Sequence, residues 1–441
     1  AITDDGSVYC WGNNTDGQIG IGYKSSYFGN PTKTHLQDGS MAVAISVGDS
    51  FSCAVLSNAS VTCWGGNDLG QLGDGTNTNS TAPVSIVQLS QDAVTVSSGQ
   101  SHSCAILQDG KVACWGNNDY GQLGDGTLID KNSPAIAQLP SSKSAVMIDV
   151  GISHTCAVMN DGTLYCWGLN ANHQLADGTN AFKSVPVQSS LPNGISATLV
   201  TAGEGHTCIL TNESTIYCIG ANSEGQIGDS TTASRTIFTE TQWNQNNSIS
   251  SLYYTLGYAT DNKISFTGWG DEYNVTSTPL PAGLTLDSEK GTLIYNGMSI
   301  FSDTITIFVT DGNVNFSKDI SIQVFEHNQL EGQIDSFSYD SGFGTSSQNP
   351  ISVRSGYHHG CLIDYDHKMK CWGMNNYGQN GYGSTGSYNN YPINVNHNYM
   401  TESKEMDVGA YQVCSIDNES QLWCWGYNAN GQLGVGDVAT K

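Results

Sequence analysis

The chain has 441 residues, 51 of them glycine, with only 12% charged residues and a net charge of −25. Because helix-forming Lys, Glu and Arg are scarce and turn residues are abundant, we expect an all-β chain of short strands. The negative charge argues against a general nucleic-acid role and against binding to anionic membranes, since both need Lys and Arg. No stretch of 18 apolar residues occurs, so we expect no membrane insertion in this segment.

The first ten residues match a later segment, residues 105–114. In this alignment the partner of Cys10 would stand one place before Ala1. Only seven residues follow Gly434, fewer than follow the same motif elsewhere. We therefore expect a segment of a longer chain, in which Cys10 pairs with a residue upstream of Ala1; alternatively, another chain supplies the missing strands. In either case Cys10 is an odd cysteine rather than a reactive thiol.

A cysteine hairpin is the unit that repeats along the chain. In its clearest copy, Cys104 and Cys114 flank Gln-Asp-Gly at residues 108–110, which fits a three-residue loop whose glycine takes a positive φ. If Leu107 pairs with Lys111, the two cysteines face each other at a distance that a disulfide can close. Twelve of the 13 cysteines stand in such pairs, ten residues apart. We therefore predict six hairpin disulfides: Cys53–Cys63, Cys104–Cys114, Cys156–Cys166, Cys208–Cys218, Cys361–Cys371 and Cys414–Cys424.

This cysteine pattern indicates an oxidising compartment, because reduced cytosolic proteins rarely keep cysteines in register through six repeats. A zinc site would need a closer Cys-x2-Cys spacing, which the sequence lacks, so we predict no metal site. The alternative to disulfides is a set of free thiols in the core. We expect the protein to be extracellular or at the cell surface.

The second cysteine of each pair usually opens Cys-Trp-Gly, and Gly-Gln-Leu-Gly-Asp-Gly or a variant follows. Seven copies occur when Cys10 is counted, and most are 51 to 53 residues apart. A period in this range is typical of β-propeller blades. One unit reads as four strands, at residues 94–97, 101–107, 111–115 and 134–138. We place the two parts of the propeller at residues 1–240 and 345–441.

An inserted domain is expected between the two parts of the propeller. Cys218 and Cys371 are 153 residues apart, about 100 more than the repeat requires. Residues 280–287, 304–312 and 317–325 alternate like half-buried strands. We predict an inserted β-sandwich over residues 247–327. Residues 241–248 and 327–350, rich in Asn, Gln, Ser and Gly, are the predicted linkers.

The repeated unit, Gly-x-x-His-(Ser/Thr)-Cys-Ala, then Asp-Gly, Cys-Trp-Gly and Gly-Gln-Leu-Gly-Asp-Gly-Thr, resembles the repeat of the regulator of chromosome condensation family. The resemblance covers residues 1–240 and 351–441 and implies a seven-bladed β-propeller. The cysteine pairs depart from the nuclear members of the family, which puts a nuclear role in doubt. The insert resembles the immunoglobulin-like domains of microbial surface proteins, through residues 280–287 and 309–312.

Four histidines each stand two residues before the first hairpin cysteine: His102, His154, His206 and His359. A ring of imidazoles could bind a metal ion. Phe51 and Gln412 take the same place in two other repeats, however, so we expect a structural hydrogen-bonding role instead.

Other motifs that suggest chemistry are better explained by turns. The Gly-Asp-Gly turns, such as residues 73–75 and 124–126, lack the Asp-x-Asp-x-Asp-Gly loop of a strong calcium site, and weak calcium binding is the alternative. Residues 381–386 match Gly-x-Gly-x-x-Gly without a βαβ unit, so we expect no dinucleotide or other cofactor. No Gly-x-Ser-x-Gly, His-Glu-x-x-His or P-loop occurs, and a carboxylate pair for glycan hydrolysis has no identifiable position.

The tryptophans of Cys-Trp-Gly raise the question of light sensing, since the plant ultraviolet-B photoreceptor shares the fold that the resemblance implies. Its Gly-Trp-Arg-His-Thr signature is absent: the matching residues 151–155 read Gly-Ile-Ser-His-Thr. We expect these tryptophans to serve packing.

Eight Asn-x-Ser/Thr sequons are candidate glycosylation sites in a host with the machinery. Asn58, Asn212 and Asn418 fall on predicted hairpin turns, where a glycan is accommodated. The other five are Asn13, Asn79, Asn246, Asn274 and Asn315.

We interpret the chain as a non-enzymatic extracellular structural or interaction module, part of a larger surface protein, adhesin or fibre subunit. Its expected partners are proteins, either further copies of itself or a surface partner, with glycans as a second class. The main alternative is a soluble propeller that inhibits another protein by binding it. A glycan-acting enzyme and an exchange factor for a small GTPase are further alternatives, the latter implied by the nuclear relatives.

Overall fold

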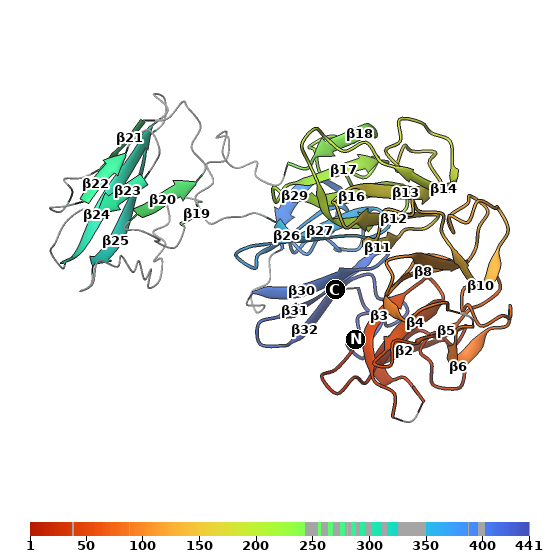
Figure 1. The fold of residues 1–441 in the computed structure, drawn as a ribbon. Helices are drawn as coiled ribbons and strands as arrows, with labels where there is room; N and C mark the ends of the chain where they lie inside the picture. The colour runs from red at the N-terminus through yellow and green to blue at the C-terminus, as the bar shows by residue number, and fades with distance from the viewer. Residues whose placement is uncertain are drawn as a thin grey trace. The chain divides into compact units, whose positions relative to one another are not determined.

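The computed structural model describes residues 1–242 except 38 and 88, residues 350–440 except 387 and 396–401, and between these parts only the strands named below and Leu280. The chain divides into two units, Ala1–Asn244 with Gln348–Lys441, and Gln245–Ser347 (Figure 1). The described residues form strands, as predicted. None of them belongs to a helix of the length and apolarity that crossing a bilayer requires.

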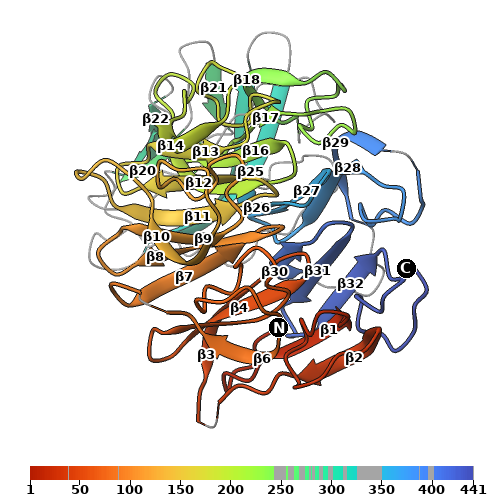
Figure 2. The same cartoon turned by 90° about the vertical axis from the view of Figure 1, so that its right-hand side faces the viewer.

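Six antiparallel sheets form the blades of a propeller in the first unit (Figures 1 and 2). Their strands, blade by blade, are β3 (Ala42–Val47), β4 (Phe51–Leu56), β5 (Val61–Gly65) and β6 (Ser80–Ser85); β7 (Ala93–Ser98), β8 (His102–Leu107), β9 (Val112–Gly116) and β10 (Lys131–Ile136); β11 (Ala145–Val150), β12 (His154–Met159), β13 (Leu164–Gly168) and β14 (Lys183–Gln188); β15 (Ala197–Ala202), β16 (His206–Thr211), β17 (Ile216–Gly220) and β18 (Arg235–Glu240); β26 (Pro350–Ser355), β27 (His359–Asp364), β28 (Met369–Met374) and β29 (Tyr388–Asn394); and β30 (Ser403–Val408), β31 (Gln412–Asp417) and β32 (Leu422–Gly426). The first strands of successive blades are neighbours, so they form an inner ring: β3, β7, β11, β15, β26 and β30.

A separate two-stranded sheet, β1 (Tyr9–Asn13) with β2 (Tyr27–Lys33), occurs in the part of the chain where the sequence predicts a further blade. β1 carries Cys-Trp-Gly, which lies on the third strand of five of the six blades, whereas β17 carries Cys-Ile-Gly. Ile2 and Val8 form an isolated bridge before β1, in the register of a hairpin. The structure therefore shows six blades, whereas the seven copies of the motif predict seven.

The predicted hairpin register is confirmed. Cys104 on β8 lies opposite Cys114 on β9, and the Leu107 N–H donates to the Lys111 carbonyl at 2.8 Å. Gly110 completes the loop with a φ of +78°.

The fourth strand of this blade differs from the prediction. β10 spans Lys131–Ile136 instead of residues 134–138. A bulge between Lys131 and Ala135 lets the pairing with β9 begin before Pro134, which has no N–H to donate.

The hydrophobic core lies between neighbouring blades. Trp115 of β9 packs against Cys53 and Cys63 of the preceding blade and is fully buried. Three further tryptophans pack in the same way against the disulfide before them: Trp167, Trp372 and Trp425. Five of the six hairpin disulfides are therefore part of the contact with the next blade, Cys156–Cys166 packing against Ile219.

The second unit holds two antiparallel sheets in the residues that can be described. One has the order β19 (Thr255–Leu256), β20 (Lys263–Thr267), β23 (Thr292–Tyr295) and β22 (Leu284–Asp287), and the other has the order β21 (Asn274–Ser277), β24 (Phe301–Thr310) and β25 (Asn315–Val324). β22, β24 and β25 overlap the three segments that alternate in the sequence. The sandwich packing of the insert lies outside the described residues. So do the predicted linkers, except Thr241, Gln242 and Pro350, which belong to the propeller unit.

Candidate functional site

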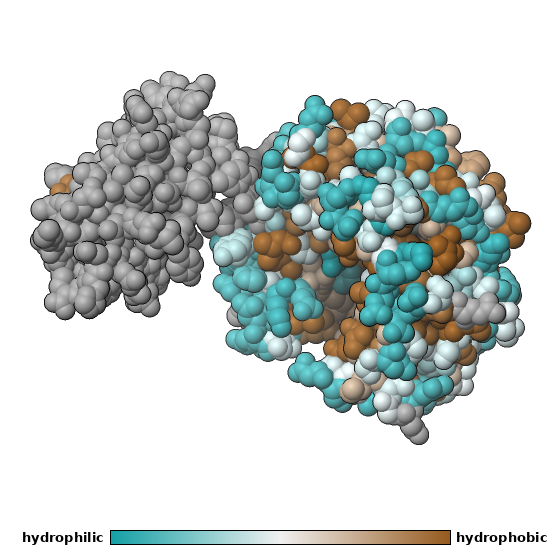
Figure 3. Space-filling view, viewed as in Figure 1, coloured by the Kyte–Doolittle hydropathy of each residue, from teal (hydrophilic) through white to brown (hydrophobic). Residues whose placement is uncertain are grey.

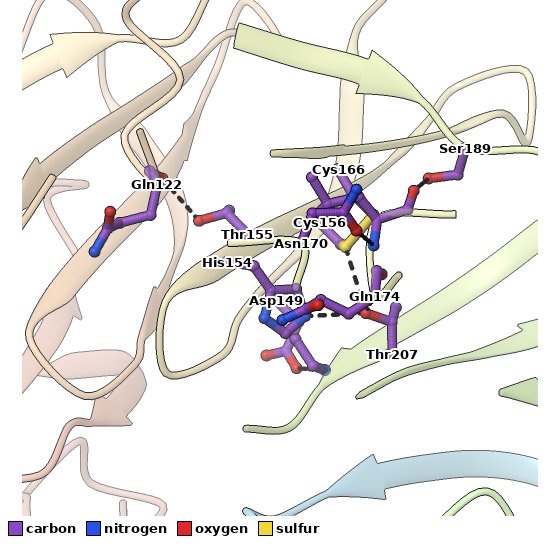
Figure 4. The surroundings of a disulfide bond; sticks show 12 residues. Gln122, Asp149, His154, Thr155, Cys156, Cys166, Asn170, Gln174, Ser189 and Thr207 are labelled. Carbon is purple, nitrogen blue, oxygen red and sulfur yellow. Dashed lines mark hydrogen bonds between the residues drawn. A yellow bond between two sulfur atoms is a disulfide. The ribbon is translucent and has the colours of Figure 1, made fainter. Parts of the chain in front are cut away.

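All six predicted cysteine pairs are joined as disulfides, and their twelve cysteines lie on paired strands. Their Cα atoms are 4.0–4.1 Å apart, because each pair faces directly across the two middle strands of its blade. Figure 4 shows Cys156–Cys166, with Thr155 and Thr207 beside it. The Thr207 hydroxyl lies 3.9 Å from the Cys156 sulfur.

Cys10 is the remaining cysteine, and it is buried without a disulfide partner among the described residues. It packs against Trp64, as the disulfides of the other blades pack against the tryptophans that follow them. Burial raises the pKa of its thiol, which keeps it protonated and unreactive. This agrees with the interpretation of Cys10 as an odd cysteine rather than a reactive one.

The motif tryptophans join each blade to the one before it. The indole N–H of Trp115 donates to the Gln71 carbonyl at 2.9 Å, and that of Trp167 to the Gln122 carbonyl at 2.8 Å. The same bond forms at four other junctions, Trp64–Gln18, Trp372–Gln226, Trp425–Gln379 and Trp11–Gln432. The last of these connects β1 to the loop after β32. These tryptophans therefore have a packing and hydrogen-bonding role.

One junction lacks the tryptophan, because Ile219 stands in its place. There the Thr207 hydroxyl donates to the Gln174 carbonyl at 2.8 Å, so that the acceptor is still satisfied. Ile219 is fully buried in the same interblade core. The substitution therefore changes the packing but leaves the Gln174 carbonyl hydrogen-bonded.

Two of the four repeat histidines make the hydrogen bond that the sequence predicts. Nε2 of His102 lies 3.0 Å from the Thr155 hydroxyl, and Nε2 of His154 lies 2.9 Å from the Thr207 hydroxyl. Because each threonine hydroxyl donates to a glutamine carbonyl, it accepts from the histidine, and this assigns the Nε2–H tautomer.

For His206 and His359 the prediction is wrong: neither ring nitrogen has a partner in the part of the chain that the structure describes. Gly360 and Val413 stand where the other blades place a serine or threonine, and neither carries a hydroxyl. Burial is the main cause that lowers the pKa of all four histidines: to about 4 for His154 and to about 3 for the other three. They are neutral at physiological pH.

Val413→Thr is expected to stabilise the propeller by about 1 kcal/mol, because the new hydroxyl accepts from His359 and donates to the Gln379 carbonyl. The matched change, Thr155→Val, removes this arrangement from the His102 junction and is expected to destabilise by about 1–3 kcal/mol. Denaturant unfolding of both variants measures the two effects. Destabilisation by Val413→Thr would contradict the assigned role of the threonine.

The aspartates of the Gly-Asp-Gly turns form hydrogen bonds within their own loops. Asp125 accepts from the Thr127 backbone and hydroxyl at 2.9 and 2.7 Å, and the Asn118 amide donates to it at 3.3 Å. Cations face the corresponding carboxylates in three blades, Lys131–Asp125, Lys183–Asp177 and Arg235–Asp229. Among the described residues no group of three potential metal ligands occurs. Turn formation accounts for these aspartates.

The inner ring of strands places one polar side chain per blade at the position opposite the first hairpin cysteine. In four blades this side chain accepts a hydrogen bond from a backbone N–H of the next inner strand: Ser46 from Ser98, Ser97 from Val150, Asp149 from Ala202, and Thr201 from Ser355. Arg354 and Asp407 hold this position in the last two blades. The hollow visible in the propeller unit in Figure 3 is bordered by hydrophilic and hydrophobic residues.

The loops between the first and second strands meet at one end of this ring. The hydroxyl of Tyr357, between β26 and β27, donates to Asp49, between β3 and β4, at 2.6 Å. Glu204, between β15 and β16, faces His358 at 2.9 Å.

Three more tyrosines form a chain of ring contacts that starts at Tyr357. Tyr357 and Tyr411 have ring centroids 6.0 Å apart, Tyr411 and Tyr377 are 5.6 Å apart, and Tyr377 and Tyr427 are 4.7 Å apart. We call these four residues the tyrosine cluster. The cluster could not be predicted from the sequence, because its members come from different loops of two blades and only the ring closure of the propeller brings them to Asp49.

The candidate glycosylation sites differ in accessibility. Asn58, Asn212 and Asn418 are exposed at hairpin turns, whereas Asn13 and Asn79 are half-buried, and the Asn79 amide donates to Asp16 at 3.1 Å. Only the backbone of Asn274 and Asn315 is described, at the first residues of β21 and β25, and Asn246 lies outside the described residues.

These features define a β-propeller whose blades are each closed by a hairpin disulfide and joined by tryptophan-to-carbonyl bonds. A family model for the RCC1-like domain matches residues 1–283, and a second model, for the regulator of chromosome condensation (RCC1) repeat, matches residues 351–379. The chain belongs to the family of RCC1-like domains.

Two curated relatives illustrate the range of this family. The chain is 30% identical over 271 residues to the ultraviolet-B receptor UVR8 of Arabidopsis thaliana, covering 60% of this chain and 61% of that protein. It is 27% identical over 235 residues to the human E3 ubiquitin-protein ligase HERC2, covering 53% of this chain and 5% of that protein. The match thus spans less than two thirds of either relative.

Solved structures show the same fold at low sequence identity. Human WBSCR16 superposes with a TM-score of 0.67 at 15% identity, covering 99% of this chain and 93% of that one. Yeast RCC1 (Prp20), solved with Kap60 bound, gives a TM-score of 0.66 at 15% identity, covering 99% and 82%.

Proposed function

We propose that this chain is a non-enzymatic, extracellular or cell-surface protein-interaction module. The observation that carries the proposal is the placement of a disulfide in each of the six blades, in one register, with five of the six fully buried. Such bonds persist in oxidising compartments and are rare in the cytosol and nucleus. A nuclear exchange-factor role fits this chemistry poorly.

Protein binding is supported by the family and by the architecture. Yeast RCC1 (Prp20) was solved with a protein, Kap60, bound to it. In this chain the rigid blades present loops at both ends, and loops on a rigid scaffold are a common place for recognition. We propose a protein partner, either a further copy of the chain or another surface protein, within a larger surface protein, an adhesin or a fibre.

We further propose that β1 and β2 are the outer half of a seventh blade. Trp11 is joined to Gln432 as the other tryptophans are joined to the blade before them. Ala1 and Tyr9 also exchange backbone hydrogen bonds of 2.8 and 2.9 Å, as the second and third strands do elsewhere. For the second unit, with its two antiparallel sheets, we propose an immunoglobulin-like β-sandwich at residues 247–327 that contributes contacts of its own.

N-glycans are expected at the exposed hairpin turns, and occupancy at Asn58, Asn212 and Asn418 should exceed occupancy at Asn79 several-fold. A glycan on Asn79 would remove its hydrogen bond to Asp16 and would need space that a half-buried side chain lacks. Glycopeptide mass spectrometry of protein secreted by a eukaryotic host measures this ratio. Equal occupancy at all four asparagines would contradict the placement of these side chains.

Electron microscopy of the native material, together with non-reducing peptide mapping, tests the proposed function. Regular fibres or surface arrays with one propeller per repeat, and six intact disulfides, are the expected result. Dispersed particles bound one-to-one to a single target would instead indicate the inhibitor type of propeller. Free thiols at the six pairs would refute the extracellular assignment.

A further inference from the structure

One end of the propeller combines aromatic and acidic side chains. At this end the loop between the first two strands of a blade is hydrogen-bonded to the loop that follows its third strand, for example Gly66 N–H to the Ser50 carbonyl and Tyr427 N–H to the Tyr411 carbonyl, both within 3.0 Å. We call these two sets of loops the loop face; they comprise residues 48–50, 99–101, 151–153, 203–205, 356–358 and 409–411, and residues 14–17, 66–69, 117–120, 169–172, 221–224, 375–377 and 427–430. All of them are described.

The loop face is negatively charged. It carries six carboxylates, Asp16, Asp49, Asp68, Asp119, Glu204 and Glu224. These loops contain no Lys or Arg, and their one histidine, His358, already faces Glu204 at 2.9 Å. From a neighbouring loop, Lys24 approaches Asp16 at 3.8 Å. Most of the carboxylates therefore lack a cation within the face itself.

The tyrosine cluster forms an aromatic surface within this acidic face. Its rings follow one another from Tyr427 through Tyr377 and Tyr411 to Tyr357, which ends on the Asp49 carboxylate. Tyr377 is 36% exposed, and the other three are half-buried. The Glu204 backbone N–H donates to the Tyr357 carbonyl at 3.2 Å, so that a second, exposed carboxylate stands beside the cluster.

We propose that the tyrosine cluster, with Asp49 and Glu204, binds an arginine-bearing segment of a protein partner. The inference rests on the proposed protein-binding function and names the surface and the chemistry of the partner. A guanidinium group stacks on aromatic faces and pairs with carboxylates, and it is less strongly hydrated than an ammonium group. Tyrosines beside carboxylates provide both contacts, whereas an anionic partner would be repelled by the face. Sugars also stack on tyrosine, but binding of a neutral sugar would not explain why carboxylates surround the cluster.

Binding of a fluorescently labelled oligo-arginine peptide, measured by anisotropy at physiological salt, tests this proposal on the full chain. Tyr377→Ala is expected to weaken binding about fivefold or more, within the range of one lost cation–π contact, and Tyr377→Phe to change it less than about twofold. Tyr120→Ala is the matched control. Tyr120 holds the same repeat position in another blade, is 42% exposed, and lies outside the cluster.

A second pair of variants distinguishes binding of the peptide at the tyrosine cluster from general attraction of the peptide to the negatively charged loop face. Glu204→Gln and Asp119→Asn remove the same charge from exposed positions on the loop face, but only Glu204 adjoins the cluster. Weaker binding by Glu204→Gln than by Asp119→Asn supports the site, and this comparison remains informative should Tyr377→Ala fail to fold.

Three results would overturn the proposal. One is equal binding by all variants, which indicates general attraction to the net charge. Another is no binding by the unmodified chain. The third is Tyr377-dependent binding of neutral oligosaccharides without binding of the peptide, which assigns the cluster to glycans. None of these bears on the disulfides or on fibre formation, so the proposed function stands or falls by its own experiment.

Discussion

Chemical reduction is expected to unfold the propeller. Each of the six disulfides joins cysteines separated by ten residues, and the chain-entropy model assigns each such loop about 2–3 kcal/mol. Six such terms together match or exceed the whole stability of an ordinary domain, about 5–15 kcal/mol. Protein that is reduced in denaturant and alkylated should show no cooperative transition in tryptophan fluorescence when the denaturant is removed.

Variants that lack one cysteine pair measure the contribution of a single disulfide to the free energy of unfolding. Cys104→Ala combined with Cys114→Ala should lower the free energy of unfolding by about 2–5 kcal/mol, because a disulfide and its packing against Trp167 are both lost. Cys10→Ala removes no intrachain bond and serves as the control. Reduced and oxidised protein unfolding at the same denaturant concentration would show that the paired cysteines do not stabilise the blades.

Acid is expected to destabilise the propeller already at pH values well above those at which carboxyl groups usually titrate. The four buried histidines have folded-state pKa values of about 3 to 4, whereas an unfolded histidine titrates near 6.5. Below pH 6.5 the unfolded chain therefore binds protons that the folded chain excludes. Their contribution to stability is complete above pH 6.5 and declines as the pH falls toward 4, by about 1.4 kcal/mol per pH unit for each histidine.

Denaturant unfolding at pH 7.5, 6 and 5 measures this slope. Combining His206→Gln with His359→Gln should reduce it by about half, because two of the four titrating groups are removed. Gln412 already occupies the same repeat position in another blade, so the fold accepts glutamine there. An unchanged slope in the double variant would mean that other groups govern the acid response.

The repeat unit could be predicted from the sequence because its determinants are local. Ten residues with a turn at the centre place Cys104 opposite Cys114 whatever surrounds the hairpin, and Gly110 accepts the left-handed conformation that the turn requires. The period of the motif then leads to a propeller. The end of β10 could not be predicted, because it depends on a bulge around Pro134.

Most contacts between blades could not be predicted from the sequence. Whether His154 has a partner depends on Thr207, 53 residues away on the next blade, and whether His359 has one depends on Val413. The tyrosine cluster depends on the same neighbour relations and on Tyr357 reaching Asp49, 308 residues away. The residue after the histidine position is Ser or Thr in four blades but Gly360 and Val413 in the other two, so the loss of the hydroxyl was visible in the sequence.

The bond from Trp11 to the Gln432 carbonyl has a consequence for how the ring is closed. It makes the seam between the first and last sheets chemically the same as the junctions inside the chain, where Trp64 meets Gln18. The seam is therefore held by the same kind of hydrogen bond as the junctions that the backbone also crosses. The junction at Ile219 has no indole bond, but the backbone crosses it and the Thr207 hydroxyl bonds the Gln174 carbonyl there.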